Sequence, residues 1–102
     1  MNEKNQPQPQ NLKVEVPNEE GFIKYSNFVI VSHSPEELVI DFARIMPGQE
    51  GAKVVSRIVM TPKNAKMFMK ALENNIENFE KKFGDIALPD NVGFNTPGGV
   101  IQ

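Results

Sequence analysis

The chain has 102 residues, of which 39% are hydrophobic and 24% charged, and its formal net charge is −2. This length predicts a single domain, and the small negative charge gives no bulk attraction to a polyanion such as nucleic acid. The sequence contains no cysteine, which excludes disulfides, thiolate metal sites and cysteine nucleophiles.

The first ten residues, MNEKNQPQPQ, are rich in Asn, Gln and Pro. They offer too little apolar surface to offset the entropy of ordering, so we expect residues 1–10 to be a flexible tail. They also lack the charged-then-apolar order of a signal peptide, and no apolar run in the chain reaches the ~20 residues of a membrane-spanning helix. We therefore expect a cytoplasmic protein that does not bind a membrane.

The next part of the chain alternates short apolar-rich segments with turn residues. LKVEV at residues 12–16 has the alternation of a short edge strand, and PNEEG then interrupts it. Three further strands are predicted at residues 25–32, 38–46 and 53–60, separated by HSPEE and PGQEG. Consecutive strands joined by short turns predict an antiparallel meander.

A long helix is predicted after the last strand. Thr61 suits the N-cap, Pro62 suits the first turn, and Gly84 is placed to end the helix in a left-handed conformation. Apolar residues recur at spacings of three and four and form one stripe: Ala65, Phe68, Met69, Leu72, Ile76, Phe79 and Phe83. The stripe also fits a heptad seam, but a helix packed on a core is favoured because a coiled coil usually needs more heptads.

The hairpin registers show which strand residues share a face. A turn at residues 47–51 places Met46 opposite Ala52, Ile40 opposite Ile58, Val39 opposite Val59 and Asp41 opposite Arg57, while a turn at residues 33–36 places Val31 opposite Leu38. One face then collects Val29, Val31, Leu38, Ile40, Phe42, Val54, Ile58 and Met60. This apolar floor suits the helix stripe, so the expected fold class is α+β: an antiparallel three- to four-stranded β-meander followed by one long C-terminal helix packed on one sheet face.

The domain is expected to span residues 11–86. Residues 87–102 hold several glycines and prolines among scattered apolar residues, so we expect an extended or disordered C-terminal arm.

The opposite sheet face is also rich in apolar residues, and one helix cannot cover both faces. We call it the back face and predict that it holds an interface formed by Phe28, Ile30, Val39, Asp41, Ala43, Val55, Arg57 and Val59. Monomers rarely leave an apolar patch of this extent exposed. We favour a homodimer over coverage by the chain's own termini or by an unidentified protein partner, since two-fold self-association is the commonest arrangement.

The sequence shows no catalytic pattern and no cofactor or metal motif. Asp41 and Arg57 are predicted to face each other, either as a cross-strand ion pair that secures the register, which we favour, or as a ligand clamp or acid-base pair. His33 is the single histidine and lies in a turn without a nucleophile pattern nearby. We therefore expect no enzymatic activity and no cofactor.

A nucleic-acid contact is the alternative function. Lys63, Lys66 and Lys70 lie three and four residues apart and would form a small basic ridge on the helix. Three aromatic residues near the strands, Phe22, Tyr25 and Phe28, could stack on bases beside such a ridge, as in single-strand binders. Core packing of these aromatics and simple solvation of the lysines are favoured.

The segments YSNFVIVSHSPEELVIDFARIMP, RIVMTPKNAK and ALENNIENFEKKFGDI together resemble a family of short prokaryotic proteins catalogued as a domain of unknown function, DUF3467. The resemblance covers residues 25–86. It implies a small strand-rich domain with a closing helix, and it supplies no catalytic residues to carry over. The leading hypothesis is thus a non-enzymatic protein-interaction or structural module that self-associates through the back face.

Overall fold

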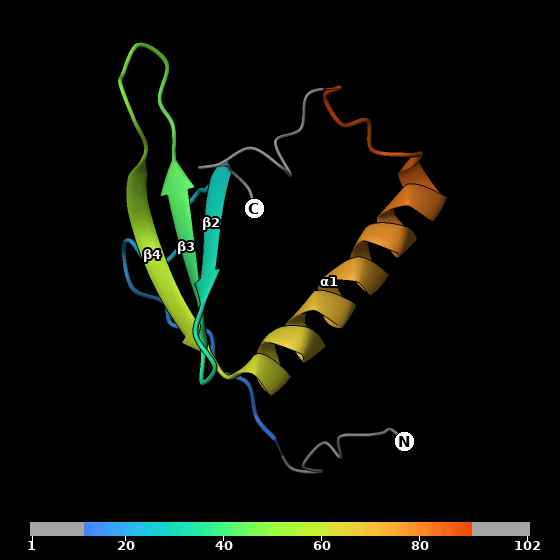
Figure 1. The fold of residues 1–102 in the computed structure, drawn as a ribbon. Helices are drawn as coiled ribbons and strands as arrows, with labels where there is room; N and C mark the ends of the chain where they lie inside the picture. Colours follow the sequence, from blue (N-terminus) through green and yellow to red (C-terminus); the bar gives the residue numbers. More distant parts are fainter. Residues whose placement is uncertain (1–11, 91–102) are drawn as a thin grey trace.

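The computed structural model describes residues 12–90 (Figure 1). Strands β2 (Phe28–His33), β3 (Leu38–Arg44) and β4 (Lys53–Met60) form one antiparallel sheet in the order β2-β3-β4, and helix α1 (Pro62–Phe83) follows. The predicted α+β class, with a meander and one C-terminal helix, is confirmed. The predicted tail at residues 1–10 and residues 91–102 of the predicted arm lie outside the described residues.

The predicted edge strand at residues 12–16 is not formed. These residues belong to no helix or strand, and Leu12, Val14 and Val16 are all exposed. Alternation of apolar and polar residues permits a strand but does not supply the neighbouring edge that its backbone groups need. The described sheet therefore has three strands.

The register of the first hairpin differs from the prediction by two residues. His33 pairs with Leu38, so Val31 lies opposite Ile40 rather than Leu38. The Ser34 N–H donates to the carbonyl of Glu37 at 2.9 Å, which closes the turn one residue later than predicted. A shift of two residues leaves every side chain on its predicted face, because the side-chain period of a strand is two.

The register of the second hairpin is confirmed over most of its length. Ile40 pairs with Ile58, Val39 with Val59 and Asp41 with Arg57. A bulge beyond Phe42 then shifts the pairing by one residue, so that Ala43 lies opposite Val54. The predicted pairing of Met46 with Ala52 is therefore not observed, because one extra residue on β4 shifts the register beyond the bulge by one residue.

Helix α1 has the predicted ends. The Thr61 hydroxyl accepts a hydrogen bond from the Asn64 N–H at 3.2 Å, which satisfies one of the free donors of the first turn. At the other end, Gly84 has a φ of 100° and its N–H donates to the Glu80 carbonyl at 2.9 Å. Its φ is positive as predicted, although its ψ of 164° lies outside the left-handed helical region.

The helix meets the sheet only near its beginning. Ala65 is buried there, but the other six residues of the stripe are between 37 and 67% exposed. In Figure 1, α1 leaves the end of β4 and diverges from the sheet along its length. Within the described residues, the buried apolar side chains are Ile40, Ala43 and Ala65, and no large side chain is fully buried.

Candidate functional site

The charged pair predicted on the back face is present. Arg57 Nε donates to Asp41 Oδ1 at 2.7 Å, and Arg57 Nη2 donates to Asp41 Oδ2 at 3.0 Å. The two side chains differ in exposure, since 12% of the Asp41 side chain is accessible and 66% of the Arg57 side chain. The pair thus holds a largely covered carboxylate against a guanidinium that reaches into solvent.

The pairing affects the ionisation of both groups. The hydrogen bonds from Arg57 lower the pKa of Asp41; burial of the carboxylate opposes this shift, and the positive charge of Arg57 adds to it. The same hydrogen bonds and the charge of Asp41 raise the pKa of Arg57 above its ordinary value. Both groups therefore carry their charges at neutral pH, as a register-holding ion pair requires, and the lowered pKa makes Asp41 a weaker proton acceptor than an ordinary aspartate.

The rest of the predicted back-face interface divides into two zones. Ala43 is fully buried, and Phe28, Val39 and Val55 are partly buried. Ile30 and Val59 remain exposed, at 37 and 53%. The back face therefore offers a smaller free apolar surface than the sequence pattern predicted.

Two polar residues of the YSN segment, residues 25–27, form hydrogen bonds to the backbone at the end of β3, and sequence reasoning missed their role. The Ser26 hydroxyl donates to the Ala43 carbonyl at 2.9 Å. The Asn27 side chain donates to the Ile45 carbonyl and accepts from its N–H, at 3.1 and 2.8 Å. These bonds continue the pairing of β2 and β3 through side chains, so the segment closes the end of the sheet.

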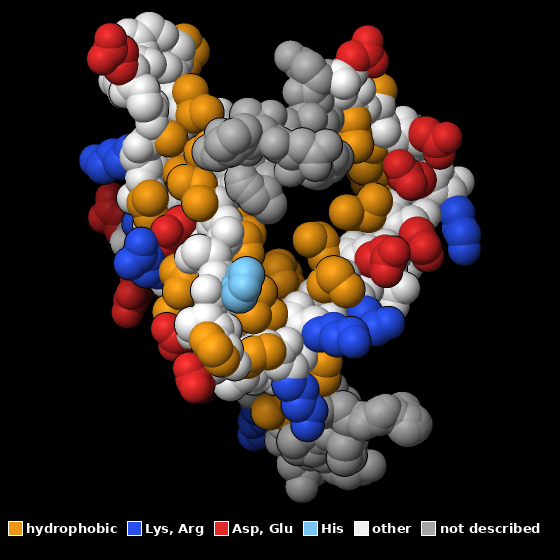
Figure 2. All heavy atoms as spheres, viewed as in Figure 1, with side chains coloured by type: hydrophobic (Ala, Val, Ile, Leu, Met, Phe, Trp, Pro, Cys, Tyr) orange, Lys and Arg blue, Asp and Glu red, His pale blue; other side chains and the backbone are white. Residues whose placement is uncertain are grey.

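The larger free apolar surface lies between the sheet and the helix, and we call it the inner surface. It comprises the α1 stripe and the side chains of Val31, Leu38, Ile40 and Ile58 on the facing side of the sheet. A groove of about 440 Å³ lies where they meet, lined by Val31, Leu38, Ile40, Pro62, Ala65, Lys66, Phe68 and Met69. Hydrophobic side chains line both walls of the hollow in Figure 2.

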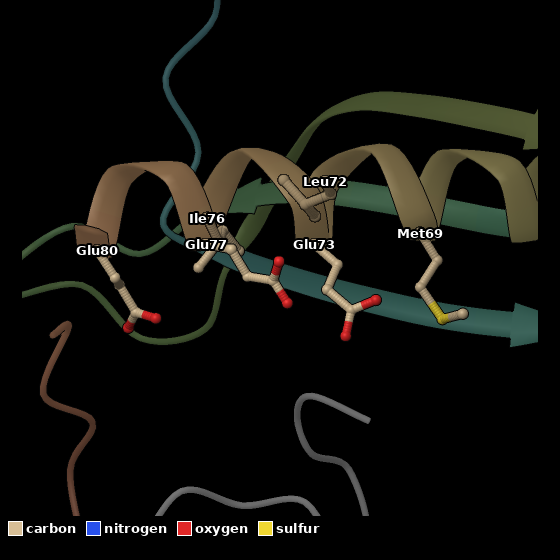
Figure 3. A pocket seen from close by; sticks show the side chains of 6 residues that line it. All are labelled: Met69, Leu72, Glu73, Ile76, Glu77 and Glu80. Atoms are coloured by element: carbon tan, nitrogen blue, oxygen red, sulfur yellow. The ribbon is translucent and has the colours of Figure 1, made fainter. Parts of the chain in front are cut away.

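A second groove follows the inner side of α1. Its volume is about 460 Å³, and it is lined by Met69, Leu72, Glu73, Ile76, Glu77 and Glu80 (Figure 3). Three of its lining side chains are apolar, and three are carboxylates that project to one side of the helix in Figure 3. Such a surface suits an apolar protein segment with a basic edge better than it suits an anionic ligand.

The three lysines predicted for nucleic-acid contact lie together on α1, but Phe28, one of the aromatic residues considered with them, lies apart. Lys63, Lys66 and Lys70 are exposed on α1, and Lys66 lines the groove next to Ile40 on the inner surface. Phe28 pairs with Ala43 and shares the back face with it. Lys66 and Phe28 therefore lie on opposite sides of the sheet.

The remaining polar residues give no further site within residues 12–90. No group of three or more His, Cys, Asp or Glu side chains in this range is arranged to hold a metal ion. His33 is exposed at the end of β2. None of the described helical residues forms a segment long and apolar enough to cross a membrane.

The family described as "Protein of unknown function (DUF3467)" matches residues 1–88. The match covers most of the chain, so the chain belongs to this family, which confirms the resemblance noted from its motifs. No curated protein and no solved structure matches the chain.

Proposed function

We propose that this member of the DUF3467 family is a non-enzymatic protein-interaction module that self-associates. The observation that carries the proposal is the exposure of the α1 stripe, of which Ala65 alone is buried. Residues ordered as a sheet and a long helix lose conformational entropy of about 1–2 kcal/mol each in the backbone alone. The three buried apolar side chains within residues 12–90, two of them alanines, do not offset that cost, so further burial is expected from a partner.

The inner surface is large enough to form the interface. Its exposed members are Val31, Ile58, Phe68, Met69, Leu72, Ile76, Phe79 and Phe83. They present roughly 700 Å² of apolar area per chain, taking about 150–250 Å² for a large side chain in full exposure. A stable interface of standard size buries about 800 Å² per partner.

The back face is the second candidate surface for self-association. Ile30 and Val59 are exposed on either side of β3, around the Asp41–Arg57 pair. An apolar contact of this size, rimmed by a charged pair, suits the edge of an interface better than its centre. We therefore place the principal contact on the inner surface and a subsidiary one on the back face.

The test is the molar mass of the full chain by size-exclusion chromatography with light scattering. The wild type is expected at about twice the 11.4 kDa of one chain. Leu72→Asp places a charge in the α1 stripe and is expected to give monomers, whereas Asn74→Asp adds the same charge on the outer side of the same helix and is expected to stay dimeric. A monomeric wild type at all concentrations tested would refute self-association.

The same chromatography also tests the two alternatives, a principal interface on the back face and binding of nucleic acid. If Val59→Asp dissociates the dimer and Leu72→Asp does not, the back face is the principal interface.

The chain has one tyrosine and no tryptophan, so bound nucleic acid would dominate the ultraviolet absorbance of the peak after isolation from a lysate. Nuclease-sensitive absorbance that is lost in high salt and on replacing Lys63, Lys66 and Lys70 would support the nucleic-acid alternative instead.

A further inference from the structure

Most of the charged residues of α1 lie on one flank of its stripe, whereas Lys63, Lys81 and Lys82 lie elsewhere on the helix. At about 100° per residue, Lys66, Lys70, Glu73, Glu77 and Glu80 all fall on the same side of the line through Leu72 and Phe79. Figure 3 shows Glu73, Glu77 and Glu80 projecting to one side of the helix. The other flank carries Asn64, Ala71, Asn75, Asn78 and Lys82.

Along this charged flank, the first half of the helix is basic and the second half is acidic. Lys66 and Lys70 precede the helix midpoint, and the three glutamates follow it. The flank therefore has a positive end and a negative end, with the exposed apolar stripe beside it. A surface of this kind is complementary to itself when one copy is reversed.

We propose that a second copy of this chain docks its α1 antiparallel along the α1 stripe. The inference rests on the proposed self-association and specifies its geometry. A two-fold axis perpendicular to two facing helices reverses their direction but keeps corresponding flanks on the same side. The basic half of each charged flank then faces the acidic half of the other.

The positions of the charges agree with a symmetric pairing. With the axis beside Glu73, near the middle of Pro62–Phe83, Lys66 of one chain lies level with Glu80 of the other, and Lys70 lies level with the turn that holds Glu77. Leu72 lies near its own copy, and the large side chains of the stripe face one another. Glu73 is the one charge that meets its own copy, with Lys70 of each chain one turn away.

A parallel pairing does not use this pattern. Rotation about an axis along the helices places the charged flank of one chain against the other flank of its partner, which is rich in asparagine. Lys82 then lies beside Glu80 of the partner, but Lys66 and Lys70 meet no glutamate, so fewer opposite charges are paired than in the antiparallel arrangement. The charge pattern therefore distinguishes between two pairings that would bury the same apolar stripe.

Single cysteines test the geometry, because the natural chain has none. Three full-length variants are prepared, Glu73→Cys, Lys66→Cys and Glu80→Cys, and each is treated with a short bifunctional maleimide. In the antiparallel dimer, two copies of position 73 adjoin the axis, whereas two copies of position 66 are separated by about 21 Å along the helices. We expect covalent dimers from Glu73→Cys, none from Lys66→Cys alone, and dimers from Lys66→Cys mixed with Glu80→Cys.

The other outcomes overturn the inference in distinguishable ways. Equal cross-linking of Glu73→Cys and Lys66→Cys, with none in the mixture, would contradict an antiparallel pairing with its axis beside position 73. Absence of cross-linking in all three, with a dimeric mass by light scattering, would mean parallel helices or an interface away from α1; it would overturn the antiparallel pairing and leave self-association intact. A monomeric mass for the unmodified chain would remove both this inference and the proposed function.

Discussion

The Asp41–Arg57 pair is asymmetric, and its asymmetry determines how each partner contributes. Asp41 is largely covered on the central strand, while most of Arg57 remains in solvent. Removing the arginine leaves a covered carboxylate without its two hydrogen bonds, which is costly. Removing the carboxylate leaves an arginine that water can solvate, so the two substitutions are not equivalent.

This difference predicts a pH-dependent effect of Arg57→Met. The pKa of Asp41 is lowered in the folded chain, so the pair stabilises the fold above the ordinary aspartate pKa, and this contribution is lost as the pH falls through the lower, folded value. The variant should therefore unfold at a lower temperature than wild type at neutral pH, with the difference shrinking below about pH 4. Thermal unfolding followed by circular dichroism at a series of pH values measures the unfolding temperatures of the two proteins and the difference between them.

Arg44→Met provides the matched control, since it removes the same charge from an exposed position on β3. Its effect on the unfolding temperature should be small and should not follow the titration of an aspartate. An Arg57→Met variant with a pH-independent deficit would mean that the arginine acts through packing of its stem, and the register-holding role of the ion pair would be withdrawn.

At the scale of elements, the helix and the three strands of the sheet were predictable because their signals are local. Thr61, Pro62 and Gly84 mark the ends of α1 by their own chemistry, and β4 was predicted with both of its ends. The bulge opposite Ala43 was not predictable, since one extra residue in a ladder has no signature in an apolar alternation. Ser26 and Asn27 were missed for a similar reason, because their partners are backbone groups 17 and 18 residues away.

The cap of α1 gives a prediction at this scale. Thr61→Ala removes the hydroxyl that accepts from Asn64 and should destabilise the chain by about 1 kcal/mol. Thr61→Ser keeps an oxygen in the same place and should stay close to wild type. Urea unfolding followed by far-ultraviolet circular dichroism gives both values; equal losses in the two variants would show that the methyl group of Thr61, rather than its cap, stabilises this junction.

For the whole molecule, sequence pattern identified the apolar faces but not what covers them. A stripe on α1 and a floor on the sheet are consistent with one chain folding on itself, and this was the arrangement predicted. The structure brings the two together only around Ala65 and Phe68 and leaves the rest of the stripe exposed. Hydrophobic burial is non-directional, so an apolar periodicity does not distinguish the chain's own sheet from a second copy.

This ambiguity leads to a prediction about stability and concentration. If two copies share one core, unfolding dissociates them, and each tenfold rise in chain concentration should add roughly 1.4 kcal/mol of stability per mole of dimer. The thermal midpoint of wild type should rise accordingly over a dilution series, while any folded fraction of Leu72→Asp should melt at a temperature independent of concentration. If the wild type unfolds in a cooperative transition whose midpoint stays constant across the series, a single chain is stable with its α1 stripe exposed to water. The inner surface would then be a site for a transient partner rather than half of a shared core.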